Sequence, residues 1–462
     1  MVAGIILLAA NRLRPAKGAL LLLLPIGFLA VMFSFRLEPM TIFLTVSMTL
    51  FLMAIFTATY LGGGWLWYSL PDYIVRFSDL FLSFFSRGVV FIRQTVRAQP
   101  EKKKASRVKR FGPALRGALI ALPILAILTA LLASADLVFS QRLGDTARAF
   151  KLENLPEYLL RGFIIAAVAY FLAGILLHAA TKSRDEEHVL GDKPVSQFLG
   201  FTESVIIMGS VVVLFASFVA IQFQYFFGGE KNIDLDGYTY AEYARRGFSE
   251  LMAVAIFSLL MLILMSLFSR RETRKRRLIF SGMGVGLVVL VLVILTSAFQ
   301  RILLYEEAYG FSRLRTYTHV FLIWLGLLLV AIMLLEILQR HRIYALAAVL
   351  TSLGFVITLG VINVDGLIVN QNVNRAIDGS ELDTGYLKSL SDDAVPALAN
   401  SYRLTAIQTS LHDDLGKVLV SFKLQRENSE GEPWQSYNFS RSRADSALNE
   451  LDSELEAYGT GE

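Results

Sequence analysis

The chain has 462 residues, of which 55% are hydrophobic and only 18% are charged, and its mean hydropathy is +0.54. An ordinary soluble domain has roughly 25% charged residues, so this composition indicates a membrane protein and disfavours a soluble globular one. The formal net charge is +5 and cysteine is absent, which excludes a disulfide framework and a thiolate metal site.

The apolar residues form runs of about 20, the length at which a helix crosses a hydrocarbon core of roughly 30 Å. The first ten residues are too short to span, and basic residues follow them instead of preceding them, so no cleaved signal is expected. The stretch 79–92 is broken by Arg87 and is expected to lie in the membrane interface. Hydropathy predicts nine spanning helices, at 18–35, 38–60, 114–139, 159–180, 200–228, 247–269, 278–300, 316–338 and 343–362.

Positive charge is concentrated in segments that fall on one side of the membrane when the predicted spans are counted along the chain. Lys and Arg gather at 12–17, 93–110, 270–277 and 340–342, which all fall on the same side of a nine-span chain. Because Lys and Arg are retained in cytoplasmic loops, the N-terminus is expected to be cytoplasmic and the C-terminus extracytoplasmic. The basic clusters lack interleaved aromatic residues, so they are interpreted as anchors to anionic lipid and no nucleic-acid partner is expected.

The hydropathy falls sharply after residue 365. Residues 366–462 contain sixteen Asp or Glu and eight Lys or Arg, a net charge of −8, so the rest of the chain carries +13. Leu and Ala recur at helical spacing in 386–402, 404–424 and 442–458, which predicts three amphipathic helices. Three domains are therefore expected: residues 1–112 with two spans, an interfacial helix and a basic linker, 113–365 with seven spans, and 366–462 as an acidic helical tail.

Polar residues recur where spans enter from the outer side. The segments "EYLLRGF" (157–163), "EYARRGF" (242–248) and "LYEEAYGFSRLR" (304–315) share a Glu before Gly-Phe, which suggests three repeated helical hairpins. One interpretation is that these residues only cap helices and anchor them at the headgroups. The other is that they converge on an outward-facing polar cavity. The predicted outer polar cluster comprises Glu157, Arg161, Glu242, Tyr243, Arg246, Tyr305, Glu306, Glu307, Tyr309, Arg313 and Arg315.

Four acidic residues fall within predicted spans: Asp136, Glu203, Glu250 and Glu336. An ionised side chain in hydrocarbon is costly unless it faces the bundle interior, finds a partner or lies near the interface. Glu250 lies one turn beyond Arg246 and can pair with it, whereas Asp136 and Glu203 lie near the ends of their spans. Interfacial positions and a role in carrying protons or ions are both open interpretations of the four.

No motif for enzymatic chemistry is present. The five histidines have no partner at i+3 or i+4, so a metal site is not expected, and neither a phosphate-binding loop nor a nucleophile elbow occurs. The sequence therefore predicts neither an enzyme nor a cofactor.

Five segments in this order, "LLASADLVFS", "GYTYAEYARRGF", "LYEEAYGFSRLR", "YLKSLSDDAVPAL" and "WQSYNFSRSRA", resemble a bacterial family of polytopic membrane proteins known only as a domain of unknown function. The resemblance runs from about residue 114 to 445. It implies a many-span protein of the bacterial inner (plasma) membrane with a short soluble tail, and it implies no activity or substrate.

Two functions remain in view. The first is an interaction or sensing platform in the lipid bilayer, whose tail binds a membrane or envelope protein. The alternative is a secondary transporter or channel for a small solute or ion, with the outer carboxylates at its mouth.

Overall fold

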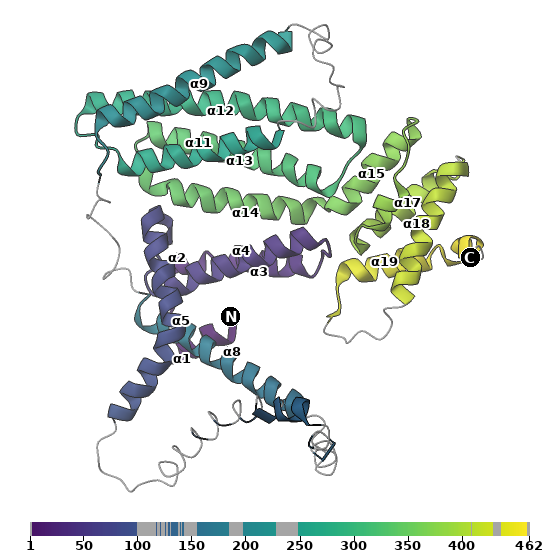
Figure 1. Cartoon of the computed structure of the whole chain (residues 1–462), viewed down its shortest axis with the longest axis horizontal. Coiled ribbons are helices and arrows are strands. Elements are labelled where there is room, and N and C mark those ends of the chain that lie inside the picture. Colours follow the sequence, from purple (N-terminus) through teal and green to yellow (C-terminus); the bar gives the residue numbers. More distant parts are fainter. Residues whose placement is uncertain are drawn as a thin grey trace. The chain divides into compact units, whose positions relative to one another are not determined.

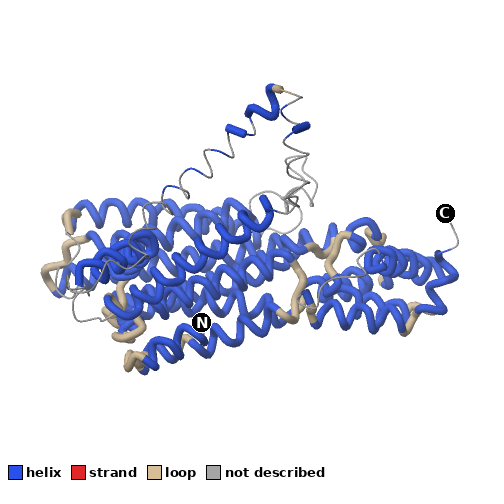
Figure 2. Tube along the Cα trace, turned by 90° about the horizontal axis from the view of Figure 1, so that it is seen from below, coloured by secondary structure: helices blue, strands red, loops and turns tan. Residues whose placement is uncertain are grey.

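The computed structural model describes residues 2–98, 155–183, 197–227, 248–407, 409–427 and 436–459, with scattered residues between 117 and 142. Nearly all of these residues lie in helices (Figure 2). Seven of the described helices are long and apolar enough to cross a membrane. The prediction of an all-α, polytopic membrane protein is therefore confirmed.

Seven predicted spans coincide with these helices. The helices are α4 (Pro39–Ala58), α8 (Leu155–Thr181), α9 (Phe201–Phe227), α11 (Phe248–Phe268), α12 (Arg274–Tyr309), α13 (Arg313–Ile337) and α14 (Tyr344–Ile362). The predicted span 114–139 falls mostly outside the described residues. The predicted span 18–35 is two helices, α2 (Lys17–Leu20) and α3 (Leu23–Phe33). Pro25 accounts for the break, because it has no N–H to donate to the carbonyl of Leu21.

The chain divides into two compact units. The first comprises residues 1–12 and 78–182, and contains α1 (Val2–Ala10), α8 and most of α5 (Leu70–Ala98). Within it, the rings of Phe84 and Phe171 stack with centroids 4.2 Å apart. A Cβ at Gly174 would lie 2.8 Å from the carbonyl oxygen of Phe84, so α5 and α8 approach backbone to backbone at this glycine.

The second unit comprises residues 13–77 and 183–462 and contains a helical bundle. Helix α12 is central, since α9, α11 and α13 all pack against it. Helix α14 packs between α13 and α4 (Figure 1). The packing face of α12 includes Gly284, Leu287, Val291, Ala298 and Ile302, spaced three, four or seven residues apart so that they lie on one side of the helix. At 36 residues, α12 is about 54 Å long at 1.5 Å per residue, so it extends beyond the hydrocarbon core.

The bundle has two ends that differ in chemistry. We call the end at residues 36–39, 310–313 and 362–364 the tail end, because the C-terminal helices adjoin it. We call the end at residues 269–274 and 338–343 the basic end, because it carries the clusters "RRETRKRR" and "RHR".

The C-terminal helices form a small domain with its own core, here called the tail domain. It contains α15 (Val364–Ile377), α16 (Thr384–Lys388), η6 (Asp392–Ala394), α17 (Val395–Leu404), α18 (Thr409–Glu427), α19 (Phe439–Asn449) and α20 (Asp452–Gly459). Leu398, Leu419 and Phe422 are buried in its core, which continues into the bundle at Val320 and Leu359. The predicted stretch 386–402 contains most of α16, together with η6 and α17. The stretch 404–424 corresponds to α18, and 442–458 corresponds to α19 and α20. Helix α15 was not predicted separately.

Candidate functional sites at the two ends of the bundle

A buried ion pair joins the bundle to the tail domain. Arg313, the first residue of α13, donates from Nε to Asp365 Oδ1 at 2.7 Å and from Nη2 to Oδ2 at 2.5 Å. Asp365 has an exposed fraction of 0% and also accepts from the backbone N–H of Ser391 at 2.8 Å and from its hydroxyl at 2.7 Å. One carboxylate therefore connects α13, α15 and the segment before η6 through charge-assisted hydrogen bonds.

Glu38 is a second buried carboxylate beside this pair. It precedes Pro39 at the start of α4 and accepts from the backbone N–H groups of Met40 at 2.9 Å and Thr41 at 2.7 Å. A carboxylate at this position satisfies amide groups that the helix leaves free and favours the positive end of its dipole. Its Oε1 also accepts from the hydroxyl of Tyr317 and lies 3.9 Å from Arg313 Nε.

Asp393 of η6 is the third buried carboxylate at the tail end. Its Oδ2 accepts from the backbone N–H groups of Leu37 at 2.7 Å and Glu38 at 2.9 Å, and its Oδ1 accepts from the hydroxyl of Ser440. Next to it, Asn438 donates to the carbonyl oxygens of Phe33 and Arg36 at 3.3 Å each. The turn between α3 and α4 is thus held by side chains of η6 and α19.

Arg36 adds a cation to the same turn. It donates to the carbonyl oxygens of Gly360 at 2.6 Å and Val361 at 3.0 Å, which the last turn of α14 leaves without helical partners. Burial lowers the pKa of the Arg36 guanidinium, although the nearby Asp393 raises it. We refer to Arg36, Glu38, Arg313, Asp365 and Asp393 together as the junction.

The sequence identified one of these five residues, Arg313. Glu38 carried a signal that could have been used, because an acidic residue directly before a proline is typical of a helix start. Asp393 lies in the family motif "YLKSLSDDAVPAL". Asp365 gave little signal, since its burial depends on the docking of residues around Ser391.

The other described members of the predicted outer cluster have separate surroundings. Arg315 lies 4.1 Å over the ring of Tyr305 and donates to the carbonyl oxygens of Tyr309 and Gly310. The side chain of Glu307 is exposed, and its carbonyl oxygen accepts from Arg375.

In the first unit, Glu157 and Arg161 form an exposed pair at 2.5 Å within one helical turn. Glu242, Tyr243 and Arg246 lie outside the described residues. The arginines of "LYEEAYGFSRLR" thus do not meet its own carboxylates, and Arg313 pairs instead with Asp365 and approaches Glu38.

Glu306, a member of the predicted outer polar cluster, is buried. It lies one turn beyond Ile302 on the packing face of α12, which turns it towards α13. Its Oε2 is 3.3 Å from Nδ1 of His319, and neither carboxylate oxygen accepts a hydrogen bond from a described residue. His319, four residues beyond Arg315 on α13, gave no sequence signal that placed it beside Glu306.

Glu336 is the buried member of the four predicted intramembrane acids. Its Oε1 accepts from Arg271 Nη1 and from the hydroxyl of Ser281, both at 2.9 Å. Its Oε2 accepts from the hydroxyl of Tyr344 and lies 3.1 Å from Nδ1 of His341. These partners come from α12, α14 and the segments flanking α11 and α14, so one carboxylate links all of these elements at the basic end.

The remaining three acids are exposed and lie near helix starts or ends. Glu203 accepts from the backbone N–H of Gly200 at 2.9 Å at the start of α9, and Asp136 accepts from that of Phe139 at 3.1 Å. Glu250 accepts from the hydroxyl of Ser249 at 2.9 Å. Capping and interfacial positions account for these contacts.

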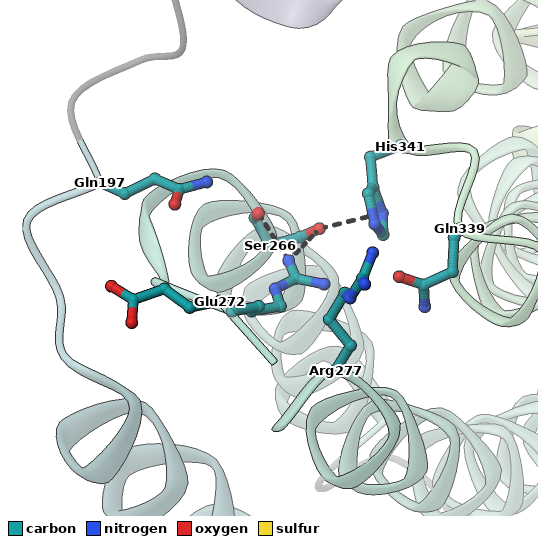
Figure 3. A pocket seen from close by; sticks show the side chains of 7 residues that line it. Gln197, Ser266, Glu272, Arg277, Gln339 and His341 are labelled. Atoms are coloured by element: carbon teal, nitrogen blue, oxygen red, sulfur yellow. Dashed lines mark hydrogen bonds between the residues drawn. The ribbon is translucent and has the colours of Figure 1, made fainter. Parts of the chain in front are cut away.

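A cavity of about 290 Å³ opens beside Glu336 at the basic end. Figure 3 shows the side chains of Arg277, Gln339 and His341 approaching one another across it. Its lining residues are Gln197, Ser266, Arg271, Glu272, Arg277, Gln339 and His341. Within the described parts of the chain, no group of three or more His, Asp or Glu side chains is arranged to hold a metal ion.

Comparison with known proteins identifies the family. No curated protein and no solved structure is significantly similar to this chain. Residues 23–401, which include both ends of the bundle and the first part of the tail domain, match a family described as a domain of unknown function. The match begins nearer the N-terminus than the sequence motifs indicated. The chain is a polytopic membrane protein that belongs to the family called domain of unknown function DUF4153.

Proposed function

We propose that this protein is a non-enzymatic interaction and sensing platform, in which the tail domain binds a membrane or envelope protein on the extracytoplasmic side and passes that event to the bundle. The main support for this proposal is the junction, which links the tail domain to the spanning helices. A tail on a flexible linker could bind a partner without affecting the spans, whereas this tail is attached through the buried carboxylates Asp365 and Asp393 to the starts of α13 and α4.

The charge distribution supports the orientation. The tail residues 366–462 carry a net charge of −8, and the basic end carries the Lys and Arg clusters. Because clustered Lys and Arg favour the cytoplasmic side, the tail domain belongs on the opposite side.

Two apolar side chains on the tail domain indicate where a partner would bind. Leu404 and Ile407, at the end of α17, have exposed fractions of 74% and 96%. Large exposed apolar residues on a folded surface are typical of interaction sites when they occur together. The rest of this turn is held in place, since Thr405 is buried and donates to the carbonyl oxygen of Ser401 at 2.9 Å.

Site-specific crosslinking tests the proposal. A photoreactive amino acid replaces Ile407 in one variant and Lys417, an exposed residue of α18, in the control. We expect Ile407 to give one adduct of defined mass in intact cells and Lys417 to give none. Absence of an adduct at Ile407, or the same adducts at both positions, would count against a partner at this turn.

The pair of Glu306 and His319 favours a second candidate function, proton-coupled transport. A buried carboxylate and a partly buried imidazole that lie together inside a helical bundle can exchange a proton with a pathway. Reconstitution into liposomes with an imposed pH gradient tests this function. Transport predicts a proton flux that Glu306→Gln abolishes and that Glu307→Gln, a change at an exposed neighbour, leaves intact. A wild-type protein that conducts no protons would exclude proton transport.

A further inference from the structure

We infer that the cavity at the basic end is a binding site for a phosphate-bearing anion. The site is separate from the junction and from the tail domain, and the proposed partner does not occupy it. Its ligand would meet the bundle where α9, α11, α12 and α13 end or begin.

The cavity is lined by the guanidinium of the exposed residue Arg277, which has no partner among the residues that the structure describes. Arg277 lines it, and within the described residues its side chain makes no hydrogen bond or ion pair. In Figure 3 its side chain is directed towards His341 and Gln339, across the cavity. A guanidinium offers five N–H donors in a planar arrangement that suits two oxygens of one phosphate group.

Arg271, unlike Arg277, uses its N–H donors in hydrogen bonds within the protein. It donates to Glu336 at 2.9 Å and to the carbonyl and hydroxyl oxygens of Ser266 at 2.6 and 2.8 Å, and it lies 3.9 Å over the ring of Phe280. Burial lowers the pKa of the Arg271 guanidinium, while Glu336 raises it. The Glu336 carboxylate therefore neutralises Arg271 and accepts from its neighbours, so the positive charge of Arg277 is available to a ligand.

His341 also lines the cavity, and its ring is held in place by neighbouring side chains. Its Nδ1 lies 3.1 Å from both Glu336 and the hydroxyl of Tyr344. These contacts fix the ring. Because Nδ1 faces the Glu336 carboxylate, it donates there, and Nε2 donates to an anion only when both nitrogens carry protons. The start of α12 at Arg274 adds partial positive charge nearby.

The acidic side chain that lines the cavity does not cancel this charge. Glu272 is largely exposed and lies 3.8 Å from Arg276. Arg270, Arg274, Lys275, Arg340 and Arg342 also lie in the two basic clusters around the cavity. A net excess of cations around a small hollow attracts anions, and its volume of about 290 Å³ accommodates a phosphate or a phosphoglycerol headgroup.

Two sources could supply such a group, a phospholipid headgroup and a soluble phosphate. The cavity lies at the ends of apolar helices, where headgroups are found, and it is open to water as well. Both sources present the same chemistry to Arg277.

Binding to the purified full-length protein tests the inference. Native mass spectrometry in detergent would measure binding of phosphatidylglycerol, with phosphatidylcholine as the zwitterionic comparison, and calorimetry would measure inorganic phosphate at constant ionic strength. We expect Arg277→Gln to weaken binding by about tenfold, since it removes a charge-assisted hydrogen bond. Lys275→Gln is the matched control, because it removes the same charge from the same exposed segment without touching the cavity.

Each outcome is informative. Phosphatidylglycerol binding that depends on Arg277 identifies a lipid site, and inorganic phosphate binding that depends on Arg277 identifies a soluble ligand. Equal losses in Arg277→Gln and Lys275→Gln would show attraction to the segment as a whole and would overturn the inference. So would a wild-type protein that binds neither probe.

Discussion

Replacing Arg313 should release the tail domain from the bundle. In Arg313→Met, Asp365 stays fully buried and loses both charged hydrogen bonds, at 2.7 and 2.5 Å, while keeping only those from Ser391. Removing one partner of a buried ion pair costs about 3–5 kcal/mol, because the remaining charge is left in a medium that solvates it poorly. The free energy of opening the tail domain should fall by that amount.

Cysteine protection measures this change, since the chain has no native cysteine. A cysteine at Leu359 of α14, which is buried where the tail core continues into the bundle, reacts with a maleimide only when the tail domain leaves the bundle. A loss of 3 kcal/mol accelerates that reaction by about 100-fold, as each 1.4 kcal/mol is a factor of ten. Arg315→Met, which removes a cation over the ring of Tyr305, should accelerate it only a few-fold at most, given about 1 kcal/mol for such a contact.

The double variant Arg313→Met with Asp365→Leu separates the pair from its surroundings. Apolar replacement of both partners removes the stranded charge, so the double variant should be more stable than Arg313→Met alone. If Arg313→Met opened the tail domain no faster than Arg315→Met, the ion pair of Arg313 and Asp365 would not be what holds the tail domain to the bundle.

Three further predictions concern single positions. Gly310→Ala should destabilise the protein by about 1–3 kcal/mol, because φ is +79° and a Cβ would lie 2.7 Å from Arg375 and 2.8 Å from Asn372; a melting curve matching that of wild type would contradict this. Glu336→Gln should lower the melting temperature in detergent more than Glu272→Gln, since Glu336 neutralises the buried Arg271 and Glu272 is exposed.

Asp392→Asn should leave stability unchanged or raise it at neutral pH, although Arg426 and Arg441 lie 3.9 and 3.8 Å away. Burial raises the pKa of Asp392 despite both arginines, so its ionised form is favoured less in the folded protein than in the unfolded chain. This penalty is present above the folded-state pKa and disappears as the pH falls below the unfolded value. The stabilities of the two proteins should therefore converge in acid, and a cost of Asp392→Asn at pH 7 would contradict the argument.

The sequence predicted the spanning helices well and their polar partners poorly. Long apolar runs such as 316–338 have one stable form in a bilayer, because every backbone group must be satisfied within the helix. The break in 18–35 was less visible, since a hydropathy average does not register the missing N–H of Pro25.

The side-chain partners depend on contacts between distant segments. Arg313 was recognised as polar and important, but Asp365 and Glu38 lie 52 and 275 positions away in the chain, and no local pattern links them. The charged stretch that contains Glu306 and Glu307 predicted that both would either anchor a helix end or line an outward-facing cavity. The helical phase of Glu306 with Ile302 on α12 placed it inside, and this phase became clear only once α12 was seen to continue to Tyr309.

Cysteine labelling from the two sides of the membrane tests whether the tail domain is extracytoplasmic and the basic end cytoplasmic. Single cysteines at Ser380, an exposed residue of the tail domain, and at Lys275, an exposed residue of the basic end, would be treated with a membrane-impermeant maleimide in intact cells. With the tail domain outside the cell, Ser380→Cys should be labelled at once and Lys275→Cys only after the cells are permeabilised. Labelling of Lys275→Cys in intact cells, with Ser380→Cys protected, would contradict this orientation.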